Sequence, residues 1–185
     1  NSGHVRVYEY DGSTWTQLGQ DLDGAVAADD SGWSVALNQD GGIVVIGSRR
    51  NDDNGNTSGH VRVYEYDGSQ WNQLGDTLIG EAAGDNAGTS VALSAEGDIM
   101  AFGAIANAGG GSQRGHVRVF QYDGTTWNQL GEDIDGEANS DQSGHSISLS
   151  SDGTIVAIGA QANDDGSGGL SAGHVRVYQY DGTAW

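Results

Sequence analysis

The sequence has no cysteine, no proline and no lysine among its 185 residues. Without cysteine, a disulfide framework and a thiolate metal site are both excluded. Without lysine, seven arginines face 26 acidic residues, and the formal net charge is −19. Nucleic acids and anionic membranes require clustered positive charge, so neither is an expected partner. No run of about 18 apolar residues is present either, which argues against direct insertion into a membrane.

Helical periodicity is also missing. No stretch places apolar residues at i, i+3, i+4 and i+7 over three turns, and the 32 glycines, with Ser, Asn and Asp, interrupt each candidate segment. The sequence therefore predicts an all-β protein.

What the chain does contain is a repeat. The stretch "GHVRVYEYDGSTW" begins at residue 3, and near copies begin at residues 59, 115 and 173, so the spacings are 56, 56 and 58 residues. Repeats of such length are typical of arrays whose units bury their apolar faces against one another.

Turn chemistry predicts two β-hairpins in each repeat. The first hairpin turns at Asp-Gly, and the second, "SGWSVALNQDGGIVVIGS" and its copies, turns at Asp-Gly or Glu-Gly. Such dipeptides between alternating apolar residues are a strong hairpin signal. Four antiparallel strands per period of about 56 residues favour β-propeller-type blades over a sandwich or a parallel β-helix.

We predict one continuous array. It begins with the outer hairpin of an incomplete blade at residues 1–22. Three blades follow, at residues 23–78, 79–134 and 135–185. An orphan hairpin exposes unpaired backbone and an apolar face. The expected partners are therefore further repeats of the same chain or copies of the chain itself, in a longer array or a filament.

The second hairpin also carries a family resemblance. Its sequences "SGWSVAL…IVVIGS", "AGTSVAL…IMAFGA" and "SGHSISL…IVAIGA", each leading to "GHVRV", resemble the FG-GAP repeat of integrin-α-type propellers. The "YDGxxW" of the first hairpin resembles kelch repeats instead. The FG-GAP resemblance implies an extracellular or cell-surface location and a structural or adhesive role. It also implies calcium in a D-x-D-x-D-G loop, but that loop is only "NQDGG", "SAEGD" or "SSDGT" here.

Calcium is the one cofactor that the residues suggest. The loops before two of the "GHVRV" segments contain matching oxygen-bearing side chains, at Asn51, Asp52, Asp53, Asn163, Asp164 and Asp165. Such a set could hold Ca²⁺ or could be a plain turn cluster. A second acidic loop supplies further carboxylates, namely Asp21, Asp23, Asp133, Asp135 and Glu137.

Three residue types recur once in each copy, and we expect structural roles for all of them. We expect the histidines to form hydrogen bonds, the arginines to stack on aromatic rings or form ion pairs between blades, and the tryptophans to form cross-strand pairs with tyrosine. These residues are His4, Arg6, Trp15, His60, Arg62, Trp71, His116, Arg118, Trp127, His174, Arg176 and Trp185. The histidines are expected to lie apart rather than on one metal. Sugar stacking is the alternative for tryptophan, and Trp33, which the other repeats replace, is the candidate ligand-binding residue.

Nothing in the sequence points to catalysis. Two common nucleophiles are missing, and the paired carboxylates lack an apolar setting that would raise their pKa values. We therefore assign no catalytic residue and predict a non-enzymatic module, with a carbohydrate- or calcium-dependent ligand-binding propeller as the alternative. Asn56 begins an N-glycosylation sequon, and surface glycans are a further candidate partner.

Overall fold

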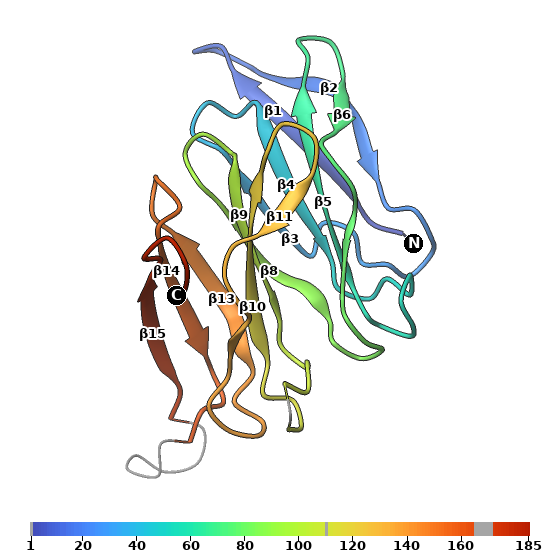
Figure 1. Cartoon of the computed structure of the whole chain (residues 1–185). Helices are drawn as coiled ribbons and strands as arrows, with labels where there is room; N and C mark the ends of the chain where they lie inside the picture. The colour runs from blue at the N-terminus through green and yellow to red at the C-terminus, as the bar shows by residue number, and fades with distance from the viewer. Residues whose placement is uncertain (1, 110, 165–171) are drawn as a thin grey trace.

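The computed structural model describes residues 2–109, 111–164 and 172–185, and within these ranges it contains strands but no helix (Figure 1). The described residues therefore contain no helix that is long and apolar enough to cross a membrane. The strands are β1 (His4–Tyr10), β2 (Trp15–Asp23), β3 (Ser34–Leu37), β4 (Ile43–Ser48), β5 (His60–Tyr66), β6 (Trp71–Gln73), β7 (Leu78–Ile79), β8 (Ala87–Leu93), β9 (Ile99–Ala104), β10 (His116–Tyr122), β11 (Trp127–Gln129), β12 (Ile134–Asp135), β13 (Ser143–Leu149), β14 (Ile155–Ala160) and β15 (His174–Gln179).

The strands form four layers in chain order. The N-terminal hairpin is β1-β2, and the first sheet has the order β3-β4-β5-β6, with β7 also paired to β5. The second sheet repeats this arrangement as β8-β9-β10-β11, with β12 paired to β10, and the third sheet is β13-β14-β15. All these strand pairs are antiparallel. The predicted all-β class, with propeller-type blades after an orphan hairpin, is confirmed. The third sheet has three strands in the described residues, one fewer than predicted.

The Asp-Gly turns fix the register of the outer hairpins. In the first sheet, Asp67 accepts hydrogen bonds from the backbone N–H groups of Ser69 and Gln70, and Gly68 takes a φ of +94°. These bonds lower the pKa of the Asp67 carboxyl below its usual range. The turn places Tyr66 opposite Trp71, with ring centroids 5.2 Å apart, and the other three hairpins repeat this pair.

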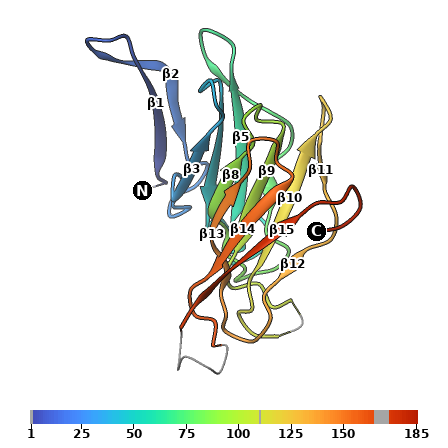
Figure 2. The ribbon, with the colours of Figure 1, turned by 90° about the vertical axis from the view of Figure 1, so that its left-hand side faces the viewer.

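Strands β4 and β9 of the first and second sheets are buried on both faces, because each of these sheets lies between two neighbouring layers (Figures 1 and 2). Alternate residues of β4 point to opposite layers: Val44 and Ile46 pack toward the N-terminal hairpin, and Val45 packs toward the second sheet. Three apolar cores result, one between each pair of successive layers. Hydrophobic burial therefore holds the layers together in series.

Glycine at the fifth position of strands β4 and β9 lets successive sheets approach closely. A Cβ at Gly47 would lie 2.1 Å from the carbonyl oxygen of Gly88 in the second sheet. Gly103 bears the same relation to Gly144 in the third sheet. The neighbouring serine uses this approach, since the Ser34 hydroxyl donates to the Gly88 carbonyl at 2.7 Å. This contact accounts for the glycine of "IGS" and "FGA" at this point.

Three of the four tryptophans of the outer hairpins connect their layer to the preceding one. The indole N–H of Trp71 donates to the carbonyl of Leu18, and that of Trp127 donates to the carbonyl of Leu74, both at 2.8 Å. Trp185 makes the same bond to the second sheet. Each of these indole rings therefore packs in its own hairpin and also bonds to the preceding layer.

Candidate functional site

The repeated histidines lie at the boundaries between layers, and three of them contact carboxylates. His60 Nδ1 lies 3.0 Å from an Asp53 oxygen, and His174 Nδ1 lies 3.7 Å from a Glu137 oxygen. Burial lowers the pKa of His60, against the opposing effect of Asp53. The histidines do not meet one another, but His116 meets two carboxylates at once.

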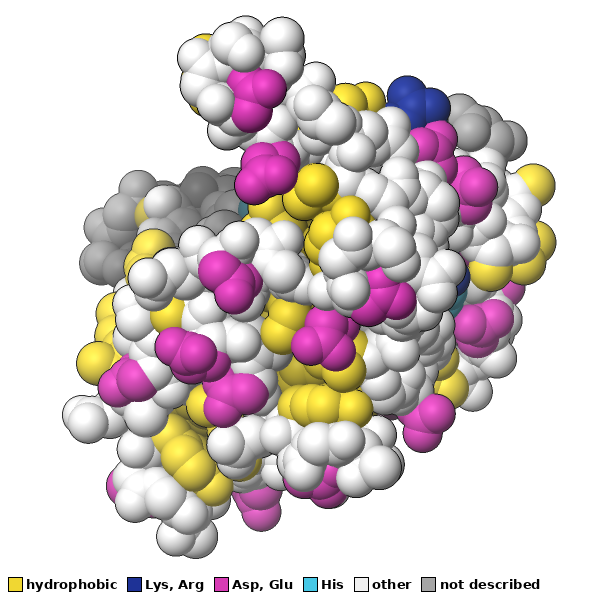
Figure 3. Space-filling view, turned by 90° about the horizontal axis from the view of Figure 1, so that it is seen from above, with side chains coloured by type: hydrophobic (Ala, Val, Ile, Leu, Met, Phe, Trp, Pro, Cys, Tyr) yellow, Lys and Arg dark blue, Asp and Glu magenta, His cyan; other side chains and the backbone are white. Residues whose placement is uncertain are grey.

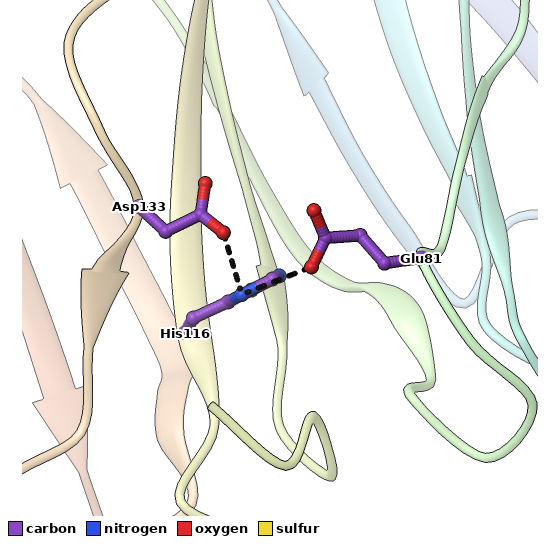
Figure 4. A group of neighbouring side chains, drawn as sticks. All are labelled: Glu81, His116 and Asp133. Carbon is purple, nitrogen blue, oxygen red and sulfur yellow. Dashed lines mark ion pairs between the residues drawn. The ribbon is translucent and has the colours of Figure 1, made fainter. Parts of the chain in front are cut away.

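Glu81, His116 and Asp133 form this cluster (Figure 4). Glu81 follows β7 of the first sheet, His116 begins β10, and Asp133 precedes β12 of the second sheet. His116 Nδ1 lies 3.4 Å from an Asp133 oxygen and 4.0 Å from a Glu81 oxygen. The imidazole is 1% exposed, whereas the Glu81 side chain is 47% exposed, so the cluster opens to solvent on the glutamate side.

Neighbouring side chains hold both carboxylates of the cluster. The Gln129 amide donates to Asp133 Oδ1 at 2.7 Å, which leaves Oδ2 facing His116. Arg118 Nη1 lies 3.6 Å from Glu81 Oε1, and the Asn107 amide lies 3.4 Å from Glu81 Oε2. The hydrogen bond to His116 lowers the pKa of the Asp133 carboxyl, although burial opposes this change. Both carboxylates are thus held beside the imidazole by neighbouring side chains.

Only one boundary in the described chain gathers three such groups. At the preceding boundary the positions of Glu81 and Asp133 are occupied by Ala25 and Thr77. Asp133 was among the predicted acidic-loop carboxylates, but Glu81 was missed. The signal that could have found it is the variation among Ala25, Glu81 and Glu137 directly after the repeated glycine.

The side chains predicted to bind calcium are engaged within their loop. Asn51 Oδ1 accepts from the backbone N–H of Asp53 at 2.8 Å, and Asp52 Oδ1 accepts from that of Thr57 at 2.7 Å. Asp53 contacts His60. These are turn-forming bonds, and they leave calcium at this loop as a prediction.

The matching loop of the third repeat is described only in part. The Asn163 amide donates to the buried Asp141 carboxylate at 3.0 Å, and Asp164 is described, whereas Asp165 lies outside the described residues. Calcium there also stays a prediction.

The other candidate residues lie on the surface. Trp33 is 51% exposed, and the Arg49 guanidinium lies 3.2 Å from the centre of its ring, so one face of the indole is covered. Asn56 is exposed in the loop that precedes β5.

The arginines at the third position of "HVRV" reach the preceding layer. Arg62, Arg118 and Arg176 donate to the carbonyls of Asp23, Ile79 and Asp135, respectively. Each guanidinium also lies near an aromatic ring of its own layer, as Arg176 lies 5.4 Å from the Tyr178 ring centre. Arg6 instead makes a bidentate contact with Asp21 in the N-terminal hairpin. Each arginine is engaged within the array or its own hairpin.

The comparison with known protein families matches the segment that contains the inner hairpin and the following "HVRV" strand. Residues 22–64 match the FG-GAP repeat. The chain therefore contains an FG-GAP repeat, as the sequence resemblance predicted. The same strand pattern recurs in the second and third sheets, outside the matched residues.

The comparison with solved structures found similar chains, one of which shares the fold with a TM-score above 0.5. A protein of Bacteroides uniformis ATCC 8492, named as a putative 6-phosphogluconolactonase, matches over 97% of this chain at 11% identity and a TM-score of 0.58. A protein of the same name from Bacteroides fragilis NCTC 9343 matches over 73% of this chain and 34% of its own, at 14% identity and a TM-score of 0.48. The chain spans 50% of the length of the first structure. No curated protein matches the sequence.

The prediction that the chain is not an enzyme is wrong. It was drawn from the missing nucleophiles and from the lack of an apolar setting for the paired carboxylates, yet the solved structure that shares this fold over 97% of the chain is named as an enzyme. At 11% identity the likeness shows the fold alone. An architecture of regular blades therefore gives no ground for excluding catalysis.

Proposed function

We propose that the chain is a structural or adhesive module of a larger FG-GAP array, and that its two end layers bind further repeats of the same kind. The observation that carries this proposal is the unequal burial of equivalent valines. Val117 and Val119 of β10 are fully buried by the third sheet, whereas Val175 and Val177 of β15 are 67% and 66% exposed. The third sheet thus presents the face that every earlier sheet buries.

The opposite end has a complementary opening. Val35 of β3 is 52% exposed, whereas its equivalent in the second sheet, Val91, is 9% exposed because β3 and β4 cover that layer. A groove of about 300 Å³ lies here, between β1 and the strands β3 and β4. In the later layers, β5 and β10 pair with the inner strands β4 and β9. An inner hairpin from another repeat would lie along β1 in the same way.

The FG-GAP repeat supports an extracellular or cell-surface setting for this array. Figure 3 shows acidic side chains scattered over the face seen from above, with apolar side chains between them. Charge of one sign keeps such a surface dispersed, while the apolar end layers provide the attraction. The adhesive contact is accordingly layer on layer, between repeats.

Sedimentation velocity over a range of concentrations tests this proposal. We expect reversible association of the 185-residue chain, and at least about tenfold weaker association for the double variant Val175→Asp, Val177→Asp, because a buried valine contributes about 1.5 kcal/mol or more. Val26→Asp is the matched control, since Val26 is 59% exposed but lies in a loop. A chain that stays monomeric at every concentration, or a double variant that associates like the control, would contradict the proposal.

A further inference from the structure

The cluster at the boundary between the first and second sheets offers one imidazole nitrogen and two carboxylate oxygens within 4.8 Å of one another. This donor set is one that Zn²⁺ uses in proteins, often with three protein ligands and a water in the fourth position. We propose that Glu81, His116 and Asp133 bind one divalent metal ion, and that Zn²⁺ is the ion that fits best. This site is independent of the contacts between end layers.

The distances suit a small tetrahedral ion. With metal–ligand bonds of about 2.1 Å, neighbouring ligand atoms lie about 3.4 Å apart. His116 Nδ1 and Asp133 Oδ2 already have this separation, at 3.4 Å. Glu81 Oε2 is 4.0 Å from the nitrogen, and its half-exposed side chain can close the difference by a small rotation. The exposed side of Glu81 leaves room for water as the fourth ligand.

A simple ion pair accounts for the arrangement less well. The buried imidazole presents a single nitrogen, Nδ1, to two carboxylates, and one proton on that nitrogen can serve only one of them. At the preceding boundary, where His60 meets one carboxylate, the pair closes to 3.0 Å. At His116 both carboxylates stand farther off. A divalent cation would bind all three groups and balance the two negative charges.

The surrounding side chains fit a metal centre as well. Metal-bound carboxylates are commonly held by outer hydrogen bonds that fix which oxygen faces the ion. Gln129 holds Oδ1 of Asp133 and leaves Oδ2 directed at His116. Arg118 lies beside Oε1 of Glu81, and the Asn107 amide lies beside Oε2. Calcium fits poorly, because it requires six to eight oxygen ligands and does not favour imidazole. Other imidazole-binding ions, such as Co²⁺ and Ni²⁺, should bind as well.

Calorimetric titration of the 185-residue chain with Zn²⁺ tests the site. We expect one Zn²⁺ per chain, and affinity reduced by at least about tenfold in Glu81→Gln and in Asp133→Asn. The matched control is Asp53→Asn, which removes the carboxylate beside His60, the equivalent histidine, and should leave Zn²⁺ affinity unchanged. Circular dichroism establishes that each variant is folded.

Nitrogen NMR of the histidine side chains gives a second readout that needs no variant. Zn²⁺ should shift the ring nitrogens of His116 and leave those of His60 in place. The proposal is overturned if no saturable Zn²⁺ uptake occurs, if the double variant Glu81→Gln, Asp133→Asn binds as tightly as the parent chain, or if His60 shifts while His116 does not.

Discussion

Trp127 tests whether the layers of this array are joined by their tryptophans. The ring is 8% exposed, packs in the core between the first and second sheets, and donates its N–H to the Leu74 carbonyl at 2.8 Å. Trp127→Ala removes all of this and leaves a cavity, for which losses of about 3–5 kcal/mol are usual. In a chain of this size, that loss should lower Tm by about 6–20 °C.

Trp15 is the matched control, because it occupies the same place in the N-terminal hairpin. Its ring pairs with Tyr10 at 5.1 Å, just as Trp127 pairs with Tyr122, but it is 68% exposed and has no described layer beside it. Trp15→Ala should therefore cost only the aromatic pair, about 0.5–1.5 kcal/mol. Thermal and urea unfolding followed by circular dichroism measure both. Equal losses in the two variants would refute the reasoning, since the tryptophans would then act only within their own hairpins.

Two further predictions follow from close contacts. Gly47→Ala should strongly destabilise the chain, because the new Cβ would meet the Gly88 carbonyl of the next sheet. In Gly159→Ala, the control, the new Cβ meets only Ser146 of its own sheet. Similar unfolding midpoints for both variants would contradict this prediction. The hydrogen bond from Arg6 lowers the pKa of Asp21 to about 2, so the stability from this pair is present above about pH 4 and lost toward pH 2. In Arg6→Gln the pKa of Asp21, measured by carboxyl NMR, should rise; an unchanged pKa would exclude the pair as its cause.

The strands and turns of this fold are readable from the sequence because they depend on local chemistry. Asp67-Gly68 bends the chain whatever lies beside it, and the alternation in "HVRVYEY" is a property of one strand. The interruption of the outer strand between β6 and β7 was not predicted. It lies at Gly75, whose φ is +71° and whose missing Cβ makes room for the Trp127 ring at 2.8 Å. Gly19 makes the same approach to the Trp71 ring within the unbroken strand β2, so this contact alone does not explain the interruption.

Contacts between layers explain which parts of the candidate site escaped sequence reasoning. The repeated histidines were recognised, and they were expected to lie apart from one another, but Glu81, one of the two carboxylates beside His116, comes from the connection that follows the preceding sheet. Glu81 is distant from His116 in sequence, and the two meet only because successive sheets stack face to face. The stacking of the sheets decides which residues meet across a boundary. The spacing of residues within one repeat does not predict these contacts.

Regular repeats need not give equivalent sites. A site at a boundary draws residues from two repeats, so each boundary combines substitutions made independently on its two sides. His60 and His116 begin equivalent strands and are equally buried, yet one faces a single loop aspartate and the other faces Glu81 and Asp133. A small number of exchanges in the connections, with the buried layers unchanged, is enough to create a distinct chemical environment. Near-identical blades therefore favour a stable scaffold and at the same time leave chemistry free to differ at each boundary between them.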